Sequence, residues 1–328
     1  MEKKYNKLEL STQMLVKEAL NRDIAVEVLD EKENLIRLSK TNKIEYIQQA
    51  TKTSADNYIV PLLMENKQVT KLLLKEQSIN VPYGITIESL DQALDAYESF
   101  ENMDIVVKPN STNFGKGVFI LDKNRTMEQY IDAVREALSF DSTVIIEHFF
   151  KGKEFRFLVI KDEVVAILHR IPANVLGDGE HTIEELVEIK NQNPTRGSGY
   201  TTPLEKIKLG NVEIGYLERE GLTKDSIPTK EEIVYLRENS NISTGGDSID
   251  YTDNMNQAYN EIALQAAKGI GAMICGIDII LSDFKAKPTK ENYTIIELNF
   301  NPALHMHNYP YQGKNRHVEK KVLDLLGF

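Results

Sequence analysis

The sequence of 328 residues has a single cysteine, Cys275, which lies inside an apolar run. One cysteine cannot form an intrachain disulfide, and it cannot supply the several thiolates of a structural zinc site. We expect it to be a buried structural thiol. The N-terminal residues also lack the apolar core of a signal peptide, and both absences favour a protein of the reducing cytoplasm.

Three further absences limit the partners and cofactors. The net charge is −11, so no basic excess points to nucleic acid. No apolar run approaches the roughly 20 residues of a membrane-spanning helix. The glycine-bearing loops fit neither the G-x-x-x-x-G-K-[ST] loop nor the G-x-G-x-x-G fingerprint, which argues against a Walker A loop and a dinucleotide-binding turn. With 27 % charged and 41 % hydrophobic residues, the composition is that of a globular protein, and the length suggests two or three domains or subdomains.

Two strand patterns near the C-terminal end carry oxygen ligands. Residues 275–281 and 295–300 each alternate as a strand does, and pairing of the two would bring Asp278 beside Glu297, with Asn299 on the same face. Two carboxylates about 4 Å apart repel by roughly 4 kcal/mol at an effective dielectric of 20, so this cluster would need a cation or a raised pKa. Hard oxygen ligands suit Mg²⁺. A hairpin with its polar face in water predicts the same pattern.

A polar loop after the strand 104–109 has features of a phosphate site. Lys108 lies at the exit of the strand, and the loop contains Gly115 and Gly117, which allow backbone N–H groups to approach phosphate oxygens. A simple turn would contain the same glycines. Lys71 lies in a helical run from 66 to 77, where a lone lysine is usually solvated.

Local signals predict several other elements. Ser11 fits the N-cap of a helix that ends near residue 21, and Thr126 with Gln129 forms the capping box of a helix over 126–139. Strands over 144–149 and 154–160 are joined by a Lys-Gly-Lys turn. Their apolar walls with a few acids would suit a nucleoside, and a plain β-meander predicts the same pattern.

Two features leave their alternatives open. His305 and His307 have the i, i+2 spacing that binds zinc on a strand, but no third soft ligand lies nearby, so a pocket wall or a structural role is equally compatible. The polar, glycine-containing stretch 237–247 is either a functional loop or a flexible surface.

Taken together, these features resemble the ATP-grasp ligases in their order along the chain: Lys71, 107–109, the loop 111–117, Glu147, Glu154, Asp278 and Glu297-x-Asn299. Within that superfamily the sequence resembles the ATP-grasp module of the bifunctional glutamate-cysteine ligase/glutathione synthetase, and more distantly cyanophycin synthetase. The resemblance extends from about Leu8 to the C-terminus and rests on four segments: 107–115 (VKPNSTNFG), 170–175 (RIPANV), 239–250 (NSNISTGGDSID) and 297–307 (ELNFNPALHMH).

The resemblance implies an α+β protein with the ATP-grasp fold, in which two α/β subdomains grip ATP. We expect a small N-terminal α/β region at residues 1–65. The ATP-grasp domain would cover residues 66–328, with a lid subdomain at about 82–148.

The resemblance also implies roles for individual residues. Lys71 and Lys108 would bind the ATP phosphates, under a lid formed by the loop 111–117. The other ATP-binding residues would be Ser111, Thr112, Asn113, Phe114, Gly115, Gly117, Glu147, His148, Phe149, Phe150 and Glu154, with adenine read largely by the main chain at 147–150 and the ribose by Glu154. Asp278, Glu297 and Asn299 would hold Mg²⁺ or Mn²⁺, as two ions. Catalysis would depend on Lys108 and on Arg237, which would steady the transferring phosphoryl group. Substrates would contact Arg170, Asn239, Asn241, Ser243, Thr244, Gly245, Gly246, Asn301, His305 and His307.

The implied activity is that of an ATP-dependent carboxylate–amine ligase that works through an acyl phosphate, as in a glutathione synthetase joining γ-glutamylcysteine to glycine. The alternatives are a ligase for another γ-glutamyl or dipeptide substrate and a nucleotide-binding module without turnover. The bifunctional family carries a large glutamate-cysteine ligase module for which 328 residues leave no room. The sequence would then be a detached synthetase module or a stand-alone relative. We expect peptide and amino-acid substrates and a separate glutamate-cysteine ligase, and a homodimer is left open.

Overall fold

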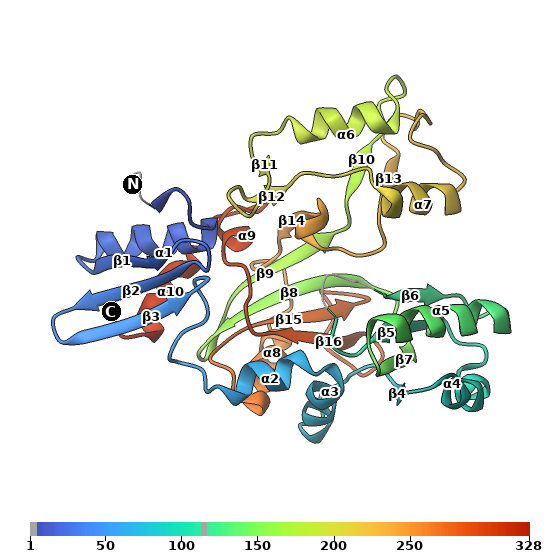
Figure 1. Cartoon of the computed structure of the whole chain (residues 1–328), viewed down its shortest axis with the longest axis horizontal. Helices are drawn as coiled ribbons and strands as arrows, with labels where there is room; N and C mark the ends of the chain where they lie inside the picture. Colours follow the sequence, from blue (N-terminus) through green and yellow to red (C-terminus); the bar gives the residue numbers. More distant parts are fainter. Residues whose placement is uncertain (1–4, 113–116) are drawn as a thin grey trace.

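The structure, a computed structural model, describes residues 5–112 and 117–328 (Figure 1). Its α-helices are α1 (Leu10–Asn21), α2 (Ile59–Glu65), α3 (Lys67–Glu76), α4 (Leu90–Ala96), α5 (Met127–Phe140), α6 (Ile183–Asn191), α7 (Asn211–Arg219), α8 (Ala258–Ile270), α9 (His305–Asn308) and α10 (Val318–Leu325). Its strands are β1 (Ala25–Asp30), β2 (Leu35–Lys40), β3 (Lys43–Gln48), β4 (Gly84–Ile87), β5 (Ile105–Pro109), β6 (Phe119–Leu121), β7 (Val144–His148), β8 (Lys153–Ile160), β9 (Glu163–Ile171), β10 (Asn174–Leu176), β11 (Arg196–Gly197), β12 (Leu204–Glu205), β13 (Ile233–Tyr235), β14 (Asp247–Asp250), β15 (Ile274–Leu281) and β16 (Tyr293–Asn299). None of these helices combines the length and the apolar character that a membrane crossing requires.

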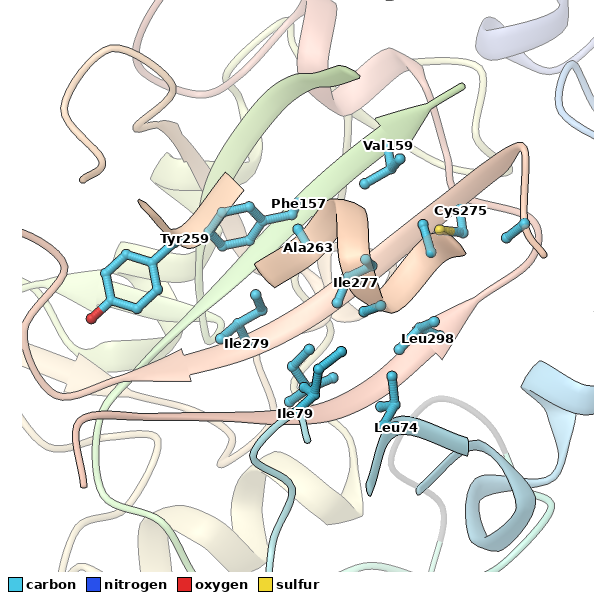
Figure 2. Packing of buried hydrophobic residues seen from close by; sticks show 14 of the residues in the cluster. Leu74, Ile79, Phe157, Val159, Tyr259, Ala263, Cys275, Ile277, Ile279 and Leu298 are labelled. Atoms are coloured by element: carbon cyan, nitrogen blue, oxygen red, sulfur yellow. The ribbon is translucent and has the colours of Figure 1, made fainter. Parts of the chain in front are cut away.

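A five-stranded antiparallel sheet in the order β14-β9-β8-β15-β16 runs through the middle of the molecule (Figure 1). One of its faces is apolar, because residues such as Phe157, Ile277 and Leu298 point to the same side and pack against α8 and α3 (Figure 2). In the register of the sheet, Asp278 pairs with Arg156 on β8 and with Glu297 on β16. The prediction that the two C-terminal strands would bring Asp278 beside Glu297 is therefore confirmed.

The opposite face of this sheet changes character along its strands. Leu158, Ile160 and Ile274 belong to a second core with α1, α10 and the three-stranded sheet β1-β2-β3. Arg156 is on the same face as Leu158, since residues two apart in a strand share a side. The N-terminal unit thus covers one end of the face, and charged side chains occupy the other end.

Two smaller units flank the central sheet. The four-stranded sheet β4-β7-β5-β6 packs on α4 and α5, and Figure 1 shows it on the side of the central sheet away from the N-terminal unit. A second unit, built from β10, β13, α6 and α7, has a small core of its own. The walls around the polar face of the central sheet therefore come from several parts of the chain.

The structure tests several local predictions. The capping box of Thr126 and Gln129 is confirmed at the start of α5. The N-cap assigned to Ser11 is wrong: Glu9 is the N-cap of α1, and the Ser11 hydroxyl instead bonds to residues 304 and 305. The strands joined by the Lys-Gly-Lys turn do not form a meander, because β7 and β8 belong to different sheets.

Candidate active site

A cavity of about 590 Å³ lies against the polar face of the central sheet, within the range of roughly 300–1,000 Å³ found for small-molecule sites. Its walls come from β5 and β7 of the four-stranded sheet, from β8, β15 and β16, from the loop 238–243 and from parts of the N-terminal unit. Segments from nearly the whole length of the chain therefore meet around one space.

Two lysines share one carboxylate at the end of this cavity formed by the four-stranded sheet. Glu147 on β7 is 2 % exposed; its Oε1 lies 2.5 Å from Lys108 Nζ, and its Oε2 bonds to Lys71 of α3. Burial, followed by the charges of neighbouring lysines, lowers the pKa of Lys71 to about 6, and burial lowers that of Lys108 to about 8. For Lys108, the charge of Glu297 acts in the opposite direction. The result is a buried cluster of two amines around one carboxylate, which carries a net positive charge when both amines are protonated and so suits an anionic ligand.

The start of the predicted lid is held by a third lysine. Lys67 donates from Nζ to the carbonyl oxygens of Asn110 at 3.2 Å and Thr112 at 2.8 Å, and the backbone N–H of Ser111 donates to Asp141 Oδ2 at 2.7 Å. The predicted ligands Asn113, Phe114 and Gly115 lie outside the described residues. Gly117 has a φ of +74°, a conformation that glycine adopts without strain.

Buried arginines surround Asp278 on the central sheet. Asp278 is 2 % exposed; it accepts from Arg156 at both oxygens, with Nη2 to Oδ2 at 2.8 Å, and from Arg170 Nη2 at 3.0 Å. Burial alone would raise the pKa of Asp278, but the charges of Arg156 and Arg170 hold it below its usual range. The second carboxylate in contact with Arg170 is Glu154, which also accepts from the Ser240 hydroxyl at 2.5 Å. Asp278 is thus neutralised by guanidinium groups.

Arg156 fits against the sheet because residue 276 is glycine. A Cβ on Gly276 would lie 2.9 Å from Arg156 Cδ and 3.0 Å from its Nη1, closer than such atoms normally approach. The missing side chain provides the space in which Arg156 lies over β15 and reaches Asp278.

Glu297 and Asn299 also line the cavity on this face, and Glu297 forms no ion pair among the described residues. The Asn299 amide satisfies both of its atoms when its oxygen accepts from Arg156 Nη2 at 3.1 Å and its nitrogen donates to Glu297 Oε1 at 3.2 Å. Among the described residues, no group of three or more His, Cys, Asp or Glu side chains gathers as a metal site would require. A divalent ion at Glu297 and Asn299 would therefore need further ligands from a bound nucleotide or from water.

The loop 237–246 divides into an inner and an outer part. Asn239, Asn241 and Ser243 line the cavity. Gly245 ends the short helix over 242–244 with a φ of +94°, a left-handed conformation that favours glycine. Arg237 lies outside the lining, and its Nε bonds to Glu213, a buried residue in the first turn of α7.

His305 is held as a neutral hydrogen-bond donor by the N-terminal helix. The Ser11 hydroxyl accepts from the backbone N–H groups of Leu304 at 3.0 Å and His305 at 3.2 Å, and it lies 3.0 Å from His305 Nδ1. These two bonds use both lone pairs of the Ser11 oxygen, so the Ser11 hydroxyl donates its proton to His305 Nδ1. Burial lowers the pKa of His305 to about 4, so the ring is neutral and Nε2 carries the proton.

The structure gathers sixteen of the predicted residues around the cavity: Lys108, Thr112, Glu147, His148, Phe149, Phe150, Glu154, Arg170, Asn239, Asn241, Ser243, Asp278, Glu297, Asn299, Asn301 and His305. Lys71 reaches it through Glu147. The remaining described ones do not line it: Ser111, Gly117, Arg237, Thr244, Gly245, Gly246 and His307. His307 is fully buried, and burial lowers its pKa to about 3.

Sequence reasoning missed several lining residues. Arg156 could have been found, because it and Glu154 are two charged residues on one side of an otherwise apolar strand. Glu9, Gln49 and Tyr200 gave no signal, since each lies outside any motif and only the fold brings them to the cavity.

Comparison with known families identifies the fold. The family model of the RimK-like ATP-grasp domain matches residues 64–179 and 236–325, and that of an ATP-grasp-like domain matches residues 6–59. The chain belongs to the RimK-like ATP-grasp family. The predicted α+β ATP-grasp fold is thereby confirmed, and the RimK-like match leaves out the N-terminal unit and the segment 180–235.

Relatives of this RimK-like chain include two proteins named glutathione biosynthesis bifunctional protein GshAB. That of Clostridium perfringens is 53 % identical over 322 residues, which are 98 % of this chain and 41 % of the relative. That of Listeria monocytogenes is 53 % identical over 319 residues, 97 % of this chain and 41 % of the relative. The chain thus spans about two fifths of the length of these relatives.

Solved structures agree with this assignment. A bifunctional glutathione synthetase from Pasteurella multocida superposes with a TM-score of 0.76 at 43 % identity, over 98 % of this chain and 44 % of that one. A D-alanine–D-alanine ligase from Bacillus anthracis gives a TM-score of 0.50 at 15 % identity, over 83 % of this chain and 68 % of that one. The second likeness concerns the fold alone. ATP-grasp ligases use ATP together with divalent metal ions.

Proposed function

We propose that this chain is an ATP-dependent carboxylate–amine ligase that joins γ-glutamylcysteine to glycine, with ADP and phosphate as products. The proposal is supported by the named function of relatives with 53 % identity over nearly the whole chain. The geometric observation that carries it is the buried cluster of Lys71, Lys108 and Glu147 on the same cavity as Glu297 and Asn299. That cavity offers cations for phosphates and oxygen ligands for a metal ion.

The cluster of lysines would bind the phosphates of ATP. Lys71 and Lys108 are already buried and directed to one point by Glu147, so little side-chain entropy remains to be lost on binding. The backbone N–H groups of His148 and Phe149 are used within the fold, at 2.9 and 2.8 Å. We therefore expect the base to depend on other groups of the 147–150 segment and on the apolar walls.

In the described conformation, two side chains offer oxygen ligands that would suit a divalent ion. Glu297 and Asn299 would hold it beside the phosphates, and Asp278 would join only if it exchanged a guanidinium partner. Mg²⁺ suits this site because it usually keeps several water and phosphate ligands around one or two protein oxygens; two ions would need Asp278 as well. When bound, the ion would offset the charge of the phosphates.

The chemistry requires positive charge and no covalent protein nucleophile. The donor carboxylate attacks the γ-phosphorus and ADP leaves, which gives an acyl phosphate; the amine then adds at the acyl carbon and phosphate leaves. Lys108, Arg156 and Arg170 border the space where these anions would meet. They would offset the repulsion between anionic partners and stabilise the transferring group.

Phosphate release tests the proposal directly. The purified chain with Mg-ATP should release phosphate only when both γ-glutamylcysteine and glycine are present, and the tripeptide should form in equal amount. No release with any of a panel of γ-glutamyl and dipeptide donors and amino-acid acceptors would refute the ligase. Release with a different pair would keep the reaction and change the substrate.

The relatives are more than twice as long as this chain. A γ-glutamylcysteine ligase activity, supplied by another polypeptide or another part of a longer one, would make the donor. We place both reactions in the cytoplasm, where a thiol product stays reduced.

A further inference from the structure

One wall of the cavity is built by the two segments that the RimK-like match leaves out. Glu9 and Gln49 come from the N-terminal unit, and Tyr200 and Glu205 come from the segment 180–235. The two segments are in contact, because the backbone N–H of Leu10 donates to the Tyr200 carbonyl at 2.8 Å. The strands β5 and β7, which carry Lys108 and Glu147 of the lysine cluster, lie on the side of the central sheet away from the N-terminal unit (Figure 1). This wall, with Glu9 and Gln49, therefore lies away from the phosphate end.

Glu9 is a half-buried carboxylate that is directed to the cavity without a partner of its own. It is the N-cap residue of α1, yet its side chain makes no capping hydrogen bond. Within 5–112 and 117–328, its carboxylate has no hydrogen bond or ion pair. The other carboxylates that line the cavity away from the bulk surface are bonded: Glu147, Glu154, Glu205 and Asp278 to cations or N–H groups, and Glu297 to Asn299.

Gln49 presents an oriented amide donor on the same wall, and Lys52 connects the two residues, because it bonds to Gln49 while its charge acts on Glu9. Its Oε1 accepts from Lys52 Nζ at 2.7 Å and from Asn301 Nδ2 at 2.9 Å, while Asn301 Oδ1 accepts from the Thr51 hydroxyl at 2.6 Å. Because a lysine can only donate, this chain of bonds fixes both amides and leaves the Gln49 NH₂ group unused. The side-chain amide of Asn301 has protein partners at both its nitrogen and its oxygen.

The backbone at this position is strained. Gln49 has a φ of 52° and Ala50 a φ of 65°, left-handed conformations that cost a non-glycine residue roughly 1–2 kcal/mol each. Such strain persists where the surrounding structure requires one orientation. In this conformation the Gln49 side chain lines the cavity.

We propose that Glu9 and Gln49 bind the free α-amino-acid head of the donor: Glu9 accepts from the α-ammonium and Gln49 Nε2 donates to the α-carboxylate. This inference rests on the proposed ligase function and adds a substrate class to it. In a γ-linked peptide the ammonium and the carboxylate remain on one carbon. In an α-linked glutamyl peptide that carboxylate is consumed in the peptide bond. The wall therefore selects γ-linked donors.

The burial and the charge of Glu9 favour a positively charged ligand such as an ammonium group. Burial raises the pKa of Glu9, and the charge of Lys52 opposes that rise. A half-buried carboxylate without an ion pair is costly to the protein, and a substrate cation would offset this cost.

Three donor peptides and two nearly isosteric variants test the inference. γ-Glutamylcysteine has both head groups, glutarylcysteine lacks only the amine, and 4-aminobutanoylcysteine lacks only the carboxylate. Glu9→Gln removes the charge. Gln49→Glu keeps an oxygen for Lys52 and Asn301 and replaces the NH₂ donor by an anion.

The expected result is a crossed pattern in KM with kcat nearly unchanged. Wild-type protein should prefer γ-glutamylcysteine to either analogue by about tenfold or more, since each loss removes a charge-assisted hydrogen bond. Glu9→Gln should raise KM about tenfold for the two amine-bearing peptides and leave glutarylcysteine within twofold. Gln49→Glu should do the reverse, raising KM for the two carboxylate-bearing peptides. Glu31→Gln, an exposed carboxylate of the same unit paired with Lys7, is the matched control and should change nothing.

Equal changes for all three peptides would show a merely structural role and overturn the inference, while the ligase function would stand. A wild-type protein that does not discriminate among the peptides would overturn it as well. If no peptide supports turnover, the proposed function fails, and calorimetric binding of the same peptides with a non-hydrolysable Mg-ATP analogue decides on the head-group site. The same crossed pattern in Kd would support it, and no binding would overturn it.

Discussion

Arg156 and Asp278 are direct register partners on β8 and β15, and Arg156 Nη2 donates to Asp278 Oδ2 at 2.8 Å. With Arg170 at 3.0 Å on the same oxygen, Asp278 is more fully compensated than an open metal ligand would be. Glu297, its partner on the other side, has the Asn299 amide instead of a cation. In the described conformation, Asp278 is therefore paired with two arginines, whereas Glu297 is hydrogen-bonded to a neutral amide.

Asp278→Asn should destabilise the fold far more than Glu297→Gln. Removal of the Asp278 charge leaves the buried Arg156 without its ion pair and Arg170 with Glu154 alone, which costs about 3–5 kcal/mol. Glu297→Gln should cost under about 1 kcal/mol, but it should lower Mg²⁺-dependent turnover by about 100-fold or more. Urea unfolding gives the stabilities and phosphate release gives the rates. Equal stability losses would contradict the division of roles, and wild-type turnover of Glu297→Gln would remove the metal assignment.

Gly276→Ala should displace Arg156. The added Cβ would meet Arg156 Cδ at 2.9 Å, and overpacking of this kind costs about 1–3 kcal/mol. Gly215 in α7 is the matched control, because nothing lies within 4 Å of the Cβ that alanine would add there. Gly215→Ala should stabilise the protein by about 0.4–1 kcal/mol. Thermal unfolding of both variants measures the difference, and the same shift for both would mean that the contact with Arg156 is unimportant.

ATP binding should weaken as pH rises. The pKa of Lys71 is lowered to about 6 and that of Lys108 to about 8, so before ATP binds Lys71 loses its proton above about pH 6 and Lys108 above about pH 8. Phosphate anions favour the charged forms, and each lysine therefore takes up a proton on binding at a pH above its lowered value. Affinity should fall by up to about tenfold per pH unit for each lysine, from about pH 6 for the first and pH 8 for the second.

Calorimetry in buffers of different ionisation enthalpy measures this proton uptake at pH 8. Lys71→Met should reduce it, and Lys123→Met, which changes an exposed lysine, should leave it unchanged. An affinity independent of pH between 6 and 9 would contradict the role of both lysines.

Sequence patterns predicted those features that depend on neighbours in the chain or on the alternation of a strand. The capping box at Thr126 needs only residues three apart, and the pairing of Asp278 with Glu297 follows from two alternating strands joined by a short connection. Ser11 was assigned to the wrong role because its hydroxyl bonds to His305, 294 residues away. No local rule contains that partner.

The same limit explains what was missed around the site. The sequence places Arg156 on a strand. Only the sheet order β8-β15-β16 shows that its side chain pairs with Asp278, which was predicted to be a metal ligand. Glu147 was expected at the strand end that reads adenine, and only the position of α3 shows that its side chain also bonds to Lys71. The order of the motifs predicted which residues gather around the cavity. It could not predict which charged side chains pair with one another, because those pairs depend on tertiary packing.

Arg237 presents the sharpest test of a role taken from resemblance. Its Nε bonds to Glu213, which is 2 % exposed and also caps α7 through Gly210 N–H at 3.0 Å. If Arg237 steadies the transferring phosphoryl group, it must leave Glu213 when substrates bind. Arg237→Ala should then lower kcat by about 100-fold or more, whereas Glu213→Gln, which keeps an oxygen acceptor, should stay within tenfold of wild type. Stopped-flow phosphate release compares the two variants. Equal losses would mean that Arg237 acts only by holding its loop against α7, and the phosphoryl group would then depend on Lys108, Arg156 and Arg170.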